Sequence, residues 1–89
     1  MQIMGRIEFD LDVLKPHIPS NYGLAQALEE IPGVLFVQIK TDEIDQKTTS
    51  IFITIKGTEE LSLESIKEKL ESMNCALHSV DRVQIDKRT

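Results

Sequence analysis

The sequence has one cysteine, no tryptophan and few aromatic residues, 4% in all. The lone Cys75 excludes an intramolecular disulfide and a zinc site built on paired cysteines. The scarcity of rings excludes the aromatic platform on which RNA-binding sheets stack bases. No apolar run approaches the length of a membrane span, so we expect no transmembrane segment.

Negative charge exceeds positive charge, with 15 Asp and Glu against 10 Lys and Arg and a formal net charge of −5. Such a surface repels phosphate backbones and anionic lipid head groups, so neither nucleic acid nor a membrane is an expected partner. The lone cysteine and the absence of a basic, apolar leader predict a cytoplasmic protein.

A strict apolar–polar alternation over residues 3–14 predicts a half-buried β-strand. The prolines within residues 15–19 predict its end, because a prolyl nitrogen cannot donate a ladder hydrogen bond. The apolar face consists of Ile7, Phe9, Leu11 and Val13, and the polar face of Arg6, Glu8, Asp10 and Asp12.

The rest of the chain predicts two helices and three strands. Apolar residues at helical spacing predict a helix over about residues 20–31, which Ser20 and Asn21 can cap, and a second from Ser62 onward, with Ser62 at its N-cap. A last strand over 76–85 carries apolar residues of mixed parity, which indicates a β-bulge or burial on both faces. Two middle strands have these expected core faces: Leu35, Val37, Ile39 and Thr41, then Ile51, Ile53 and Ile55.

This βαββαβ order with short connections predicts an α+β protein with a ferredoxin-like split βαβ fold, in one domain over residues 1–89. We expect an antiparallel sheet of order 4-1-3-2 with both helices on one face. The other face of the sheet is then left open.

The predicted topology brings polar side chains toward one end of the sheet, as a candidate site for a divalent cation. Carboxylates suit Ca²⁺ or Mg²⁺, whereas an imidazole favours Zn²⁺ or Mn²⁺. The competing interpretation is a solvated hairpin tip and histidines that bond to neighbours, since no EF-hand or HExxH spacing is present. The candidate ligands are Asp12, His17, Glu43, Asp45, His78 and, about 10 Å further along the last strand, Asp81.

Phe36 and Phe52 are expected on the open face of the sheet, beside carboxylates that we expect to pair with Arg6, Lys40 and Lys56. Apolar rings on an otherwise polar face predict a covered surface, with another copy of the chain as the expected partner. The edge strands offer a second route to self-association.

Four segments resemble a family of small archaeal proteins known only as a domain of unknown function. They are residues 11–17 (LDVLKPH), 33–34 (GV), 43–45 (EID) and 77–81 (LHSVD). The resemblance implies ferredoxin-like domains in higher oligomers, with calcium associated with at least one member, and it implies no catalytic activity. Ca²⁺ is therefore the first ion to consider.

Three functions follow from these features. The first is a non-enzymatic homo-oligomer that binds a divalent cation or a small polar ligand at subunit borders. The second is a small-molecule-sensing regulatory domain that acts on a partner protein in trans. The third, a small enzyme using Asp12 and His78, has the least support, because no nucleophile or phosphate-binding motif is present.

Overall fold

The computed structural model describes residues 5–87 and contains four strands and two helices in the predicted order. Ser20 caps the first helix by accepting a hydrogen bond from the Gly23 amide, and Ser62 caps the second by accepting one from the Ser65 amide. The elements are β1 (Arg6–Pro16), α1 (Asn21–Glu29), β2 (Val34–Ile44), β3 (Thr48–Thr58), α2 (Leu63–Ser72) and β4 (Ala76–Asp86).

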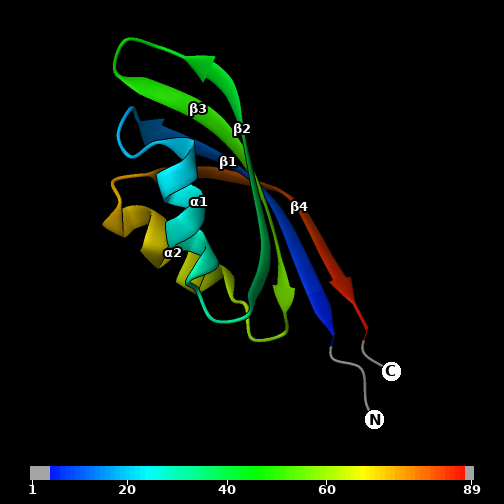
Figure 1. Cartoon of the computed structure of the whole chain (residues 1–89). Helices are drawn as coiled ribbons and strands as arrows, with labels where there is room; N and C mark the ends of the chain where they lie inside the picture. The colour runs from blue at the N-terminus through cyan, green and yellow to red at the C-terminus, as the bar shows by residue number, and fades with distance from the viewer. Residues whose placement is uncertain (1–4, 88–89) are drawn as a thin grey trace.

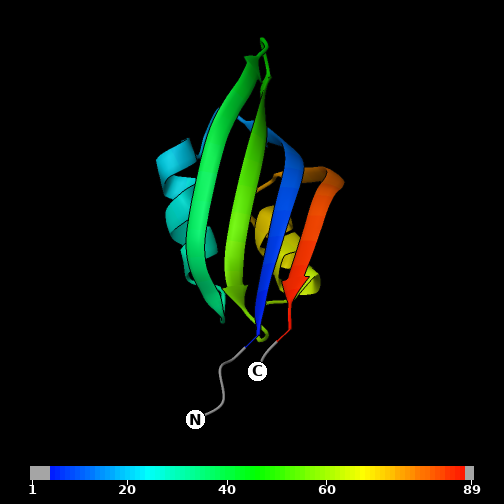
Figure 2. The same cartoon turned by 90° about the vertical axis from the view of Figure 1, so that its right-hand side faces the viewer.

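The four strands form one antiparallel sheet in the order β2-β3-β1-β4, which is the predicted 4-1-3-2 order in reverse. Both helices cover the same face of this sheet (Figure 1), and the opposite face is open (Figure 2). The arrangement is consistent with a ferredoxin-like fold. Among the described residues, no helix is long and apolar enough to cross a membrane.

The hydrophobic core lies between the sheet and the helices. Alternate residues of β1 and β3 point into it, which confirms the core faces expected from the period of two. Burying an aliphatic side chain contributes roughly 1.5–3 kcal/mol, so this layer determines which face of each strand is covered. The fully buried side chains are Leu11, Val13, Leu24, Leu28, Ile51, Ile53, Ile55, Ile66 and Leu70.

Strand β1 continues beyond its predicted end. Pro16 is the last residue of the ladder and lies opposite Thr48, where a missing amide donor is tolerated. Parity directs Lys15 to the core side, where its side chain is 3% exposed and its Nζ donates hydrogen bonds to the carbonyl oxygens of Pro16 (2.8 Å) and Pro19 (2.6 Å). The predicted start of the strand at residue 3 lies outside the described residues.

The prediction that Leu35 belongs to the core was wrong. Its side chain is 60% exposed, because the pairing of β2 with β3 shifts register between Val34 and Phe36. Val34 takes the core-side position opposite Gly57 instead, and Leu35 is the extra residue of a bulge.

The predicted bulge in the last strand is confirmed, and two irregularities are present. The pairing of β4 with β1 skips His78 and Asp81. These two extra residues correct the mixed parity of the apolar residues, so that Leu77 lies opposite Val13 and Val80 lies opposite Leu11 on the core side.

Gly57 of β3 packs closely against Gly33 and Leu61 at the end of the sheet. A Cβ on Gly57 would collide with the carbonyl oxygen of Gly33 and lie 2.8 Å from Leu61 Cδ2. We expect Gly57→Ala to lower the free energy of unfolding by about 1–3 kcal/mol, the usual cost of overpacking. Urea denaturation measures this change.

Gly23→Ala is the matched control, because a Cβ there meets no atom closer than 3.5 Å in the first turn of α1. Alanine should raise stability by about 0.5–1 kcal/mol at this helical position. Equal effects of the two substitutions would contradict the packing described for Gly57.

Candidate functional site

The bulges of β4 determine where two of the predicted site residues lie. A residue inserted in a bulge has no opposite residue, so the strand bends and its side chain takes a new direction. His78 and Asp81 are the inserted residues, and both line pockets together with side chains of the open face. The same feature that aligns the core residues of β4 therefore directs an imidazole and a carboxylate away from the core.

His78 lines a pocket of about 310 Å³ with Asp12, Leu14 and Ser50. Asp12 and Leu14 are on the open face of β1, and Ser50 lies opposite Leu14 on β3. The sequence predicted that Asp12 and His78 lie near each other. Ser50 and Leu14 were missed, although their parity with Phe52 and Asp12 already put them on this face.

The polar side chains of this pocket have no partners in the part of the chain that the structure describes. Within residues 5–87, the side chains of Asp12, Ser50 and His78 form no hydrogen bond or ion pair with another described residue. Asp12 and Ser50 are half-buried, and His78 is exposed. A carboxylate, an imidazole and a hydroxyl are thus available to a ligand without breaking a contact in the fold.

His17 does not line this pocket, and both of its ring nitrogens are hydrogen-bonded. Its Nε2–H donates to the carbonyl oxygen of Gln46 (2.9 Å), so Nδ1 is the acceptor in the neutral ring and receives the hydroxyl of Thr49 (3.1 Å). The imidazole thereby fastens the loop after β1 to the β2–β3 turn. A metal ion could bind His17 only by displacing one of these bonds.

The other predicted ligands are distributed over the sheet. Glu43 lies on β2 opposite Ser50, one strand away from the side chains of β1, and Asp45 closes the β2–β3 turn by a bond from its amide to the carbonyl of Thr48 (2.8 Å). The carboxylate of Asp81 accepts the hydroxyl of Ser79 (2.6 Å). Among the described residues, no group of three or more His, Cys, Asp or Glu side chains is arranged to hold a metal ion. The six-residue metal site remains a prediction.

A polar network crosses the open face next to the pocket. Arg82 of β4 donates from Nε to Asp10 (2.7 Å) and from one terminal nitrogen to Glu8 (2.9 Å), and Thr54 of β3 donates to Asp10 (2.8 Å). The expected partner Lys56 lies 3.9 Å from Glu8. Arg82 was missed, because its face follows from two bulges whose positions the sequence did not fix.

These hydrogen bonds change the acidity of the groups involved. The bonds from Arg82 and then from Thr54 lower the pKa of Asp10, and the two carboxylates raise the pKa of Arg82. Burial raises the pKa of the Cys75 thiol on the other side of the sheet, which makes it a structural rather than a reactive cysteine. The network therefore holds Asp10 as a carboxylate, paired and unavailable to a ligand.

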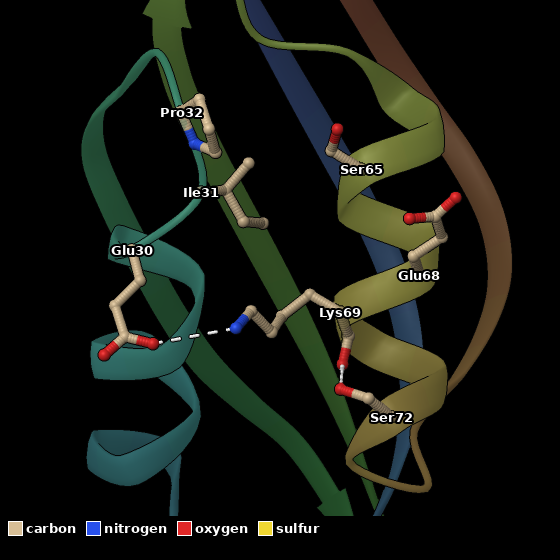
Figure 3. A pocket seen from close by; sticks show the side chains of 7 residues that line it. All are labelled: Glu30, Ile31, Pro32, Ser65, Glu68, Lys69 and Ser72. Carbon is tan, nitrogen blue, oxygen red and sulfur yellow. Dashed lines mark hydrogen bonds and ion pairs between the residues drawn. The ribbon is translucent and has the colours of Figure 1, made fainter.

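Another pocket, of about 370 Å³, lies between the two helices (Figure 3). Lys69 of α2 spans it to reach Glu30 at 3.6 Å, and the hydroxyl of Ser72 donates to the Lys69 carbonyl. Several of its polar groups are thus already paired within the chain. We therefore place the candidate site at Asp12 and His78 rather than in this groove.

Comparison with known proteins identifies the family. The model of DUF211, described as uncharacterized ArCR, matches residues 8–89. The chain belongs to the DUF211 family. It is also similar to the uncharacterized protein MJ0319 of Methanocaldococcus jannaschii, with 36% identity over 78 residues, which cover 88% of this chain and 79% of that protein. The predicted membership of an archaeal family of unknown function is confirmed, and DUF211 brings no assigned activity to the site.

The Arg82–Asp10 contact predicts how the DUF211 chain responds to acid. The pKa of Asp10 in the folded protein lies below its unfolded value of about 3.9. The ionised carboxylate therefore contributes fully to stability above about pH 3.9, and this contribution is lost as the pH falls through the folded pKa. In Arg82→Gln we expect the Asp10 pKa to rise toward its ordinary value, measured by carboxyl ¹³C NMR titration.

Lys67→Gln removes the same charge from an exposed position on α2 and should leave the titration of Asp10 unchanged. An Asp10 titration curve that is identical in Arg82→Gln and in the unsubstituted protein would contradict the network.

Proposed function

We propose that this protein is a non-enzymatic homo-oligomer that holds a divalent cation or a small polar ligand at the borders between subunits, with Ca²⁺ as the first candidate ion. The observation behind the proposal is the pocket that Asp12, Ser50 and His78 line with side chains that have no partner among the described residues. A cytoplasmic setting accords with a chain whose one cysteine is a free, buried thiol.

The pocket offers half of a coordination shell. Asp12 provides carboxylate oxygens and His78 a ring nitrogen, whereas Ca²⁺ takes 6–8 ligands and Zn²⁺ takes about four. Ser50 adds one neutral oxygen. The remaining ligands must come from water or from a second subunit, and a carboxylate from a neighbouring copy would complete a shell that one chain leaves open.

Exposed apolar side chains in the pocket and elsewhere on the open face support a neighbouring subunit. Leu14 lines the pocket and is 40% exposed, and Phe52 and Phe36 on the same face are 40% and 42% exposed. The ring of Phe36 lies below Lys56, whose Nζ is 4.8 Å from the ring centroid. Burial of these side chains against another copy would gain hydrophobic energy that the single chain forgoes.

A small polar ligand is the alternative occupant, and it would suit a regulatory sensor. A second pocket, of about 300 Å³, lies over Phe52 on the same open face and is lined by Lys40 and Asp81 among others. An ammonium and a carboxylate beside a flat ring match a zwitterion that carries both charges. A partner protein acting in trans would then receive the signal.

Native mass spectrometry of chelator-treated protein, with and without added Ca²⁺, tests the proposal. We expect a defined oligomer that takes up a stoichiometric number of ions. Asp12→Asn and His78→Gln should each weaken ion binding at least tenfold, because each removes one of the two charged or nitrogen donors of the half-site.

Glu71→Gln is the control, since it removes a carboxylate from the exposed side of α2 without touching the pocket. A strictly monomeric protein, or ion uptake that is the same in Asp12→Asn and in the unsubstituted chain, would refute the cation site. A melting-temperature shift with a zwitterionic ligand in place of an ion would favour the sensor.

A further inference from the structure

The two edges of the sheet differ in their ability to accept another strand. β4 is interrupted by its bulges at His78 and Asp81, and bulges protect an edge from pairing. The irregularities of β2, at Leu35 and Asp42, lie near its ends. Residues 36–41 between them pair one-to-one with β3, so the outer side of β2 presents a regular stretch of backbone.

A groove of about 300 Å³ lies beside this edge, between α1 and β2. It is lined by Tyr22, Ala25 and Gln26 of the helix and by Leu35 and Val37 of the strand, among others. Tyr22 is 74% exposed and Leu35 is 60% exposed. Large apolar side chains thus stand exposed at the margin of a strand that is itself unpaired on its outer side.

We propose that β2 pairs antiparallel with β2 of a second copy about a two-fold axis at Ile39, and that Tyr22 of each copy enters the groove of the other. This inference rests on the homo-oligomer of the proposed function and adds a second contact between subunits, at the edge of the sheet rather than over its open face, together with its register. The dimer contains one continuous sheet of both copies, with the helices of both on the same side.

The charges of β2 disfavour the two registers on either side of this one. Side chains of paired strands must share a face, so the axis has to pass through a residue rather than between two. An axis at Lys40 would set two ammonium groups against each other, and an axis at Gln38 would add a second lysine to Phe36, whose ring already carries Lys56. An axis at Ile39 sets Ile39 against its own copy and Gln38 against the partner's Lys40, without a like-charge pair.

The same register positions Tyr22. The side chain of Asn21 donates to the Thr41 hydroxyl (2.9 Å), which fixes the start of α1 beside that residue. With the axis at Ile39, the partner's Thr41 lies opposite Val37, and the partner's Tyr22 arrives beside the groove that Leu35 and Val37 line. The exchange is reciprocal, as a two-fold interface requires.

Sedimentation equilibrium of Tyr22→Asp tests the groove. We expect the dissociation constant of the pairwise contact to rise at least tenfold, because a carboxylate would have to enter a groove that Glu29 already lines. Ile85→Asp is the matched control, an exposed apolar residue on the opposite edge strand (71% exposed), and should leave association unchanged. Equal association of Tyr22→Asp and the unsubstituted protein would overturn the proposal.

Single cysteines in a Cys75→Ala background test the register. Oxidation should link Ile39→Cys to its own copy, and should link Gln38→Cys and Lys40→Cys far less. A disulfide that forms preferentially at residue 38 or 40, or the absence of a disulfide at all three positions, overturns the proposed register. Ca²⁺ uptake by Tyr22→Asp separates the two proposals. If this variant no longer pairs through β2 but still binds the ion, the cation site does not depend on the β2 contact. If the cysteine variants form an oligomer but no cross-link, the subunits associate through another surface and the β2 pairing is refuted.

Discussion

The alternation of β1 is the constraint on which the rest of the structure depends. β1 lies between β3 and β4 and pairs with both, so the face on which Leu11 and Val13 are buried fixes the face of every residue opposite them. A slip by one residue would expose these side chains and bury Asp10 and Asp12, at a cost of several kcal/mol for each carboxylate taken from water. Burial of Leu11 and Val13 therefore also places Asp10 and Asp12 on the open face.

The bulges of β4 add two polar residues, His78 and Asp81, to the open face. Leu77, Val80 and Val83 are spaced by three, so only an extra residue in each interval allows all of them to match alternate residues of β1. The extra residues are polar, and His78 lines a pocket with Asp12 of the open face as a result. Further along the strand, Arg82 pairs with Asp10 and Glu8. Two carboxylates of β1 are thereby paired with a cation, whereas Asp12 is left available.

Most of the fold could be predicted from the sequence, because periods of two and 3.6 and the serine caps are local signals. The site could be predicted only in part. The proximity of Asp12 and His78 followed from strand order, whereas the roles of Ser50 and Arg82 depended on the strand register. The hydrogen bond from His17 to the β2–β3 turn depended on the conformation of the loop after β1. Leu35 was misplaced for the same reason, since a bulge in β2 has no signal in the local pattern of residues.

The central claim is that Asp12 and His78 form a half-site for a cation, completed at a subunit border. A crystal structure of the protein grown with Mn²⁺, with anomalous diffraction data to locate the ion, tests it most directly. The account predicts an anomalous peak within coordination distance of an Asp12 oxygen and a His78 nitrogen, with further ligands from a neighbouring subunit or water. Peaks confined to other places, or an empty pocket at saturating Mn²⁺, would contradict it.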